Sequence, residues 1–118
     1  MKRGMAVAAV VALALAFGGT ARAQDAAKIE KGKQVYDAAA PKCKVCHAIG
    51  GVGNAKGALD GVGAKLKADE IKAWMRTPKE MTEKTKAARK PFMPVYPQEK
   101  LTDEDLEALT AYMLSLKK

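Results

Sequence analysis

The chain has 118 residues, with 21 Lys and Arg against 13 Asp and Glu, a formal net charge of +8 and 48% hydrophobic residues. This length suits one domain and is too short for a two-domain enzyme with an interdomain cleft. The ordinary apolar share argues against disorder, the positive charge favours an anionic partner, and the 5% aromatic content is low for a small domain that must build its own core.

The N-terminus has the layout of a secretory signal peptide. Lys2 and Arg3 precede an apolar run of 13 residues from Met5 to Phe17, and an A-x-A site follows at residues 21–23. The run is shorter than the roughly 20 residues that span a bilayer as a helix. We therefore predict a cleaved leader over residues 1–23 and a mature domain over residues 24–118, with an uncleaved anchor as the alternative. Removing Lys2, Arg3 and Arg22 leaves 18 basic against 13 acidic residues, a charge of +5.

The mature part predicts three helices, two irregular stretches and no convincing strand. The first helix spans about Asp25–Ala39, with Asp25 as its N-cap, and a glycine-rich stretch follows over Gly50–Gly63. A short helix is expected over Asp69–Arg76, and a proline-rich stretch over Pro91–Pro97. The last helix begins after the N-cap Thr102 and carries one apolar stripe of Leu106, Leu109, Met113 and Leu116.

Both cysteines and the only histidine fall in one motif, Cys43-Lys44-Val45-Cys46-His47. C-x-x-C-H is the attachment sequence of c-type haem, because two thiols on one turn can reach both vinyl groups of a porphyrin while the next residue offers imidazole to the iron. The alternatives are weaker. A structural zinc site needs four ligands, a thioredoxin-like dithiol needs a βαβ unit, and a disulfide here would close too small a loop to stabilise much.

From about Ile29 to Leu116 the sequence resembles a class I, monohaem cytochrome c. The stretches that carry the resemblance occur in the family's order: GKQVY at 32–36, CKVCH at 43–47, GALDGVG at 57–63, WMRTP at 74–78, PFMP at 91–94 and LTDEDLEALTAYMLSL at 101–116. The resemblance implies an all-α cytochrome c fold, with three main helices and long loops around one covalent haem c. It also implies covalent attachment at Cys43 and Cys46, and His47 as an axial ligand of the iron.

With no second histidine, methionine is the expected sixth ligand of the iron. Of the four methionines in the mature chain, Met75 and Met113 are expected to be packing residues on helices. Met93 lies between two prolines in a stiff loop before the last helix, where the family also places its ligand, and Met81 is the competitor. Ligation by His47 and Met93 leaves no open position for a substrate, so we expect one-electron transfer and no enzymatic activity.

The family also suggests neighbours for the haem. The Nδ1–H of a haem-ligating histidine donates to a backbone carbonyl, and the corresponding residue here is Ala58, after Gly57. Trp74 and Tyr96 are candidates for bonding the propionates or covering the ring, with plain core packing as the alternative. The first and last helices are expected to meet at four residues, Gly32, Tyr36, Leu109 and Tyr112.

The expected function is that of a periplasmic one-electron carrier. Lys42, Lys44 and Lys90 flank the haem motif and the Met93 loop, and would steer docking onto acidic faces of redox proteins, a reductase or dehydrogenase as donor and an oxidase or other protein as acceptor. A merely solvated surface is the alternative for these lysines. Nucleic acid is a poor partner, since aromatic and basic residues do not interleave. We expect a monomer with no transmembrane segment in the mature chain.

Two other functions stay open. The haem could serve as an electron-transfer subunit of a larger periplasmic oxidoreductase complex, passing electrons from a partner's active site. It could also be five-coordinate, as in a gas sensor or a peroxidase-like protein.

Overall fold

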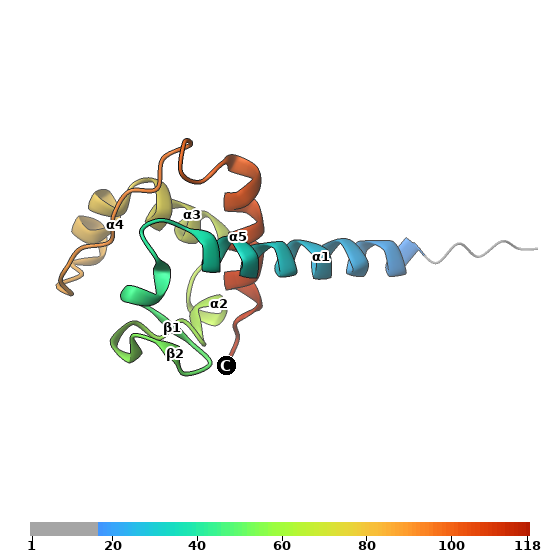
Figure 1. The fold of residues 1–118 in the computed structure, drawn as a ribbon, viewed down its shortest axis with the longest axis horizontal. Coiled ribbons are helices and arrows are strands. Elements are labelled where there is room, and N and C mark those ends of the chain that lie inside the picture. Colours follow the sequence, from blue (N-terminus) through green and yellow to red (C-terminus); the bar gives the residue numbers. More distant parts are fainter. Residues whose placement is uncertain (1–16) are drawn as a thin grey trace, which may run out of the picture.

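A computed structural model describes residues 17–118 of the chain, and this part is mostly helical (Figure 1). The elements, in chain order, are α1 (Phe17–Ala38), the 3-10 turn η1 (Cys43–Val45), β1 (Ala48–Ile49), β2 (Val52–Gly53), the 3-10 turn η2 (Ala55–Gly57), α2 (Val62–Lys65), α3 (Ala68–Arg76), α4 (Pro78–Thr85) and α5 (Asp103–Ser115). Among the described residues, no helix has the length and apolar character that crossing a membrane requires.

The first helix is longer than the sequence predicts. It ends at Ala38, one residue before the expected end, but it begins at Phe17, so Asp25 lies inside it and the predicted N-cap is wrong. Alanine, the strongest helix former, recurs through residues 21–27 and explains the extension. The N-terminal half of α1 projects away from the rest of the molecule (Figure 1). The remaining predicted leader, residues 1–16, lies outside the described residues, and its cleavage stays a prediction.

Helices α1 and α5 pack closely because Gly32 has no side chain. A Cβ atom at Gly32 would overlap the carbonyl oxygen of Ala108 and lie 2.6 Å from Cβ of Tyr112. One turn later, the rings of Tyr36 and Tyr112 meet edge to face with their centroids 6.1 Å apart. The predicted meeting of the first and last helices is confirmed, with Ala108 as the closest neighbour of Gly32.

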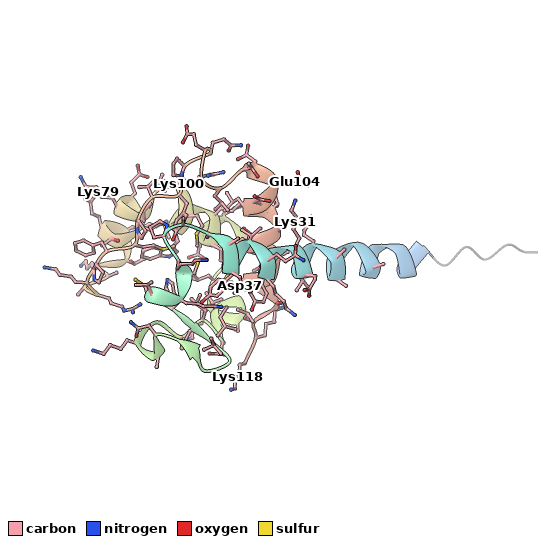
Figure 2. All side chains as sticks on the ribbon, viewed as in Figure 1. Lys31, Asp37, Lys79, Lys100, Glu104 and Lys118 are labelled. Atoms are coloured by element: carbon pink, nitrogen blue, oxygen red, sulfur yellow. The ribbon has the colours of Figure 1, made fainter. Side chains whose placement is uncertain are left out.

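An exposed ion pair joins the same two helices on their outer side. Nζ of Lys31 lies 2.7 Å from a carboxylate oxygen of Glu104, and both residues are labelled in Figure 2. Because pairs in contact with water contribute little to stability, the apolar contact at Gly32 dominates this helix pair.

The C-terminal helices match the predicted ones, with one addition. Helix α3 begins one residue before the predicted start, and the N-cap of α5 is confirmed because Oγ1 of Thr102 accepts from the amide of Asp105 at 3.2 Å. Pro78 separates α3 from the following chain as expected, but it also occupies the first turn of α4, which the sequence analysis missed. Proline is well suited to that position, where its missing N–H has no partner within the helix.

The glycine-rich stretch is more ordered than predicted. Strands β1 and β2 form a two-residue antiparallel hairpin, in which Ala48 pairs with Gly53, and η2 and α2 follow. By contrast, residues 91–97 contain no helix or strand, as predicted. The hairpin therefore fixes the chain directly after His47, whereas the segment around Met93 depends on contacts with other parts of the molecule.

The buried core joins α1, α3 and α5 with the segment that precedes α5. Three residues of the predicted α5 stripe are buried, whereas Leu116 follows the end of α5 and is half-buried. The core cluster consists of Tyr36, Ile71, Tyr96, Leu101, Leu106, Leu109, Tyr112 and Met113. This core leaves one side of α5 facing the cysteine motif and the proline-rich segment.

Candidate functional site

The cysteine motif folds into a single 3-10 turn. The amides of Cys46 and His47 both donate to the carbonyl oxygen of Cys43, at 3.1 Å and 2.8 Å. This tight turn brings both thiols and the imidazole to the wall of one cavity. The predicted attachment residues are therefore together in space as well as in sequence.

The cavity has a volume of about 500 Å³, which lies within the range of cofactor sites, roughly 300–1,000 Å³. Its walls come from α1, η1, α2, α3, α4, α5 and the proline-rich segment, and most of the lining side chains are apolar. The lining includes Tyr36, Cys43, Cys46, His47, Leu59, Val62, Leu66, Ile71, Trp74, Met75, Phe92, Met93, Tyr96, Leu109 and Met113. Such a lining suits a flat, apolar group much larger than a water molecule.

The imidazole of His47 is held in one tautomer. Its Nδ1 lies 2.9 Å from the carbonyl oxygen of Gly57, and a carbonyl can only accept, so Nδ1 carries the proton and Nε2 keeps its lone pair. The predicted acceptor, Ala58, is wrong by one residue. The chain around Ala58 pairs instead with Ala48, whose carbonyl accepts from the amide of Leu59, so the preceding carbonyl faces the imidazole.

Burial lowers the pKa of His47, and the nearby Arg89 guanidinium lowers it further, while the bond to Gly57 opposes both effects. The imidazole is therefore neutral at neutral pH, which is the form that binds a metal ion.

The proline-rich segment is tied down around Tyr96. The amide of Tyr96 donates to the carbonyl of Met75 at 2.9 Å, and its own carbonyl accepts from Nη1 of Arg76 at 2.8 Å. Its hydroxyl donates to the carbonyl of Pro41 at 2.6 Å, just before the cysteine motif. Tyr96 is buried and lines the cavity, but its hydroxyl proton is used within the protein. The half-buried Trp74 also lines the cavity.

Of the four methionines among residues 17–118, three reach the cavity and one does not. Met75, Met93 and Met113 line it, whereas Met81 is buried on α4 away from the lining. Met75 and Met113 lie on the helices α3 and α5 that form the core, and Met113 is among its buried members. Met93 is half-buried on an extended segment outside any helix. This contrast favours Met93 over Met81 as the side chain that can act as a metal ligand in the cavity.

One buried polar atom also fits a cavity that holds a cofactor. Tyr36 is 5% exposed and lines the cavity, and its hydroxyl has no hydrogen-bond partner within residues 17–118. Burial raises the pKa of this phenol to about 12, so it stays protonated. Together with the two thiols, the imidazole and the methionine thioethers on an apolar wall, this arrangement fits a haem better than it fits a closed protein core.

The three lysines expected to steer docking lie near the mouth of the site but differ in their contacts. Lys42 donates to the carbonyl of Asp37 at 2.9 Å, and Lys44 pairs with the Asp37 carboxylate at 2.9 Å. Asp37 is labelled in Figure 2 at the end of α1. The ammonium of Lys90 lies 5.9 Å from the ring centre of the exposed Phe92. Of the three lysines, Lys44 is the one that pairs with a carboxylate, whereas Lys42 binds a backbone carbonyl and Lys90 lies over an aromatic ring.

Sequence reasoning missed two contacts of the site. One is the carbonyl of Gly57, and the other is Arg89, whose Nη2 donates to the carbonyl of Cys46 at 2.6 Å. A signal for the second was available, since only two arginines, Arg76 and Arg89, follow residue 23 among many lysines. Arginine is favoured over lysine where a rigid fork must hold fixed acceptors.

A family model described as Cytochrome c matches residues 29–117. Among curated proteins, cytochrome c oxidase subunit 2 of Alkalihalophilus pseudofirmus (strain ATCC BAA-2126 / JCM 17055 / OF4) is 33% identical over 96 residues, which cover 74% of this chain and 25% of that protein. The chain thus spans about a quarter of the length of that relative. No solved structure matches the chain significantly.

Proposed function

This chain belongs to the cytochrome c family, and we propose that it is a one-electron carrier with a single haem c, bound covalently at Cys43 and Cys46 and ligated by His47 and Met93. The family and the mostly helical structure confirm the predicted all-α cytochrome c fold. Membership of the family also implies a haem with iron and a role in haem-based electron transfer. The covalent links, the ligand pair and the role as a carrier are the proposal.

The observation that supports this proposal most is that the side chains of Cys43, Cys46, His47 and Met93 all line one apolar cavity. The thiols of Cys43 and Cys46 would form thioethers with the haem, and His47 would offer the Nε2 lone pair that its bond to Gly57 leaves free. The bound haem supplies one-electron exchange between Fe(II) and Fe(III). The thioether of Met93 would favour Fe(II) and raise the reduction potential.

The same ligand set supports the absence of enzymatic activity. His47 and Met93 would together hold the iron, so no position on it would be left for a substrate. The apolar walls around Leu66, Ile71 and Trp74 would exclude water from the ring and reduce solvent reorganisation during electron exchange. This describes a carrier, whose chemistry is confined to a change of one electron.

Replacing Met93 by alanine should remove the weak sulfur-to-iron charge-transfer band from the visible spectrum of the oxidised protein. The reduced variant should also bind CO strongly and show a lower reduction potential, because the thioether that occupies the sixth position is gone. Met81→Ala is the matched control, since Met81 lies outside the cavity lining, and this variant should keep the band. A band that survives in Met93→Ala and disappears in Met81→Ala would reverse the assignment.

We also propose that the carrier is exported to the periplasm and docks through its lysines onto acidic faces of redox partners. The basis is the leader-like N-terminus and the charge of +5 on residues 24–118. Exposed Val45 and Phe92 lie on the cavity wall beside Lys44 and Lys90, so the cavity mouth combines apolar and positive surface. Such contacts are small and transient, and their association rates fall as ionic strength rises.

A second function is favoured by the similarity to part of an oxidase subunit. In that case the chain would pass electrons within a larger complex. For a free carrier, gel filtration of a native extract should place all the haem of this protein at the elution volume of a small monomer. Elution of the haem together with a large catalytic subunit would contradict the free carrier and support the complex.

A further inference from the structure

The segment that carries Met93, residues 89–97, is attached to the chain around the cysteine motif at two points, one just before the motif and one within it. At its C-terminal end, Tyr96 donates to the carbonyl of Pro41, as described above. At its N-terminal end, Arg89 reaches the carbonyl of Cys46, the residue directly before His47. The second contact joins residues 43 positions apart in the sequence, and it links the two segments that supply the proposed iron ligands.

Arg89 is exposed, but its guanidinium lies close against Gly57. A Cβ atom at Gly57 would overlap Nη1 of Arg89 and the carbonyl oxygen of Cys46, and would lie 2.9 Å from Nδ1 of His47. Gly57 thus leaves room for the guanidinium beside the imidazole, and its own carbonyl holds that imidazole. The side chain of Arg89 therefore contacts Gly57 and Cys46 beside His47, while its backbone belongs to the Met93 segment.

Arginine suits this position better than lysine would. Its planar fork presents several N–H donors in fixed directions, and its charge makes a hydrogen bond to a carbonyl stronger than a neutral donor would. The only other arginine after residue 23, Arg76, binds the carbonyl of Tyr96 at the opposite end of the same segment. Both arginines thus hold the segment, one at each end.

We propose that Arg89 is a positioning residue that holds the Met93 segment against the haem-attachment turn and so keeps the methionine on the iron. This role rests on the proposed ligation by Met93. Without Arg89, the N-terminal end of the segment loses its tie to Cys46, and residues 87–93 gain freedom to swing away from the cavity. The carbonyl of Cys46 would then be left to water. The sixth position would open more often, and an external ligand would compete more successfully.

The test is to titrate the oxidised, haem-loaded protein with imidazole. Binding is measured by the loss of the sulfur-to-iron band. We expect Arg89→Ala to bind imidazole about tenfold more tightly than the wild type, the change that one lost hydrogen bond from a charged donor corresponds to. Lys84→Gln is the control, because it also removes one positive charge shortly before the segment in the sequence, and the Lys84 side chain has no hydrogen bond or ion pair within residues 17–118. This control should bind imidazole as the wild type does.

The outcomes separate this role from the proposed function. A wild type that shows the band, with equal imidazole affinity in Arg89→Ala, would overturn the role of Arg89 alone. An equal gain in Lys84→Gln would also overturn it, because the charge and not the contact would then be responsible. A wild type that lacks the band would overturn the ligation by Met93 itself. A urea titration of each variant adds a further check, since a merely structural loss would lower the unfolding midpoint without changing imidazole affinity in water.

Discussion

Replacing both Cys43 and Cys46 by serine is expected to abolish covalent haem binding and most of the folded protein with it. The chain has two cysteines, and both line the cavity. Without the haem, the apolar side chains around this cavity of about 500 Å³ would face water instead of the ring. A small domain has a total stability of only about 5–15 kcal/mol, so the loss of this apolar contact is expected to unfold most of the molecules.

The measurement is haem staining of the purified chain on a denaturing gel, together with its far-ultraviolet circular dichroism. The wild type should retain haem through denaturation, and the double variant should lose both the haem signal and most of its helical signal. Val45→Ala is the matched control, since Val45 is exposed between the two cysteines and should leave attachment unchanged. A double variant that keeps its haem through denaturation would contradict the attachment at these cysteines.

Replacing Gly32 by alanine should destabilise the haem-loaded protein by about 1–2 kcal/mol. The added Cβ would overlap the carbonyl of Ala108, and overpacking of this kind typically costs about 1–3 kcal/mol and occasionally more. Alanine gains up to about 1 kcal/mol in helix propensity over glycine, which offsets part of this cost. The clash involves backbone atoms of α5, so it can be relieved only by moving the two helices apart.

Urea unfolding followed by circular dichroism measures this change in the free energy of unfolding. Gln34→Ala is the control, because Gln34 is exposed on the same helix and its replacement should stay within about 0.5 kcal/mol of the wild type. A Gly32→Ala protein as stable as the wild type would mean that α1 and α5 do not approach as closely as described.

Local features of the site were readable from the sequence because they depend on neighbours along the chain. The turn at Cys43–His47 closes through hydrogen bonds between residues three and four apart. The N-cap at Thr102 and the stripe on α5 are likewise set by adjacent residues and helical period. The predicted start of α1 is wrong because Asp25 could cap the helix only if the residues before it were not helical. The alanines before Asp25 favour helix, and α1 begins at Phe17.

Contacts between distant segments could not be read in this way. Whether Gly57 or Ala58 faces His47 depends on how the chain after the hairpin pairs with Ala48. The hydroxyl of Tyr96 was a candidate for the haem propionates and binds the carbonyl of Pro41 instead. Helix α4 escaped notice because its sequence, PKEMTEKT, is charged and short, and its two buried residues are too few to form a stripe.

The sequence by itself determined the family resemblance, the attachment motif, the last helix and a short set of methionines, because each is encoded in spacing or in residues close along the chain. Only the tertiary structure decided which methionines line the cavity, which carbonyl holds the imidazole and where Arg89 binds. Those features depend on segments that are distant in the sequence being brought together by packing, such as Arg89 and Cys46, which are 43 residues apart, and no local pattern records such contacts. The low aromatic content is explained by the proposed cofactor, since a bound haem would fill the cavity that the few aromatic side chains leave open.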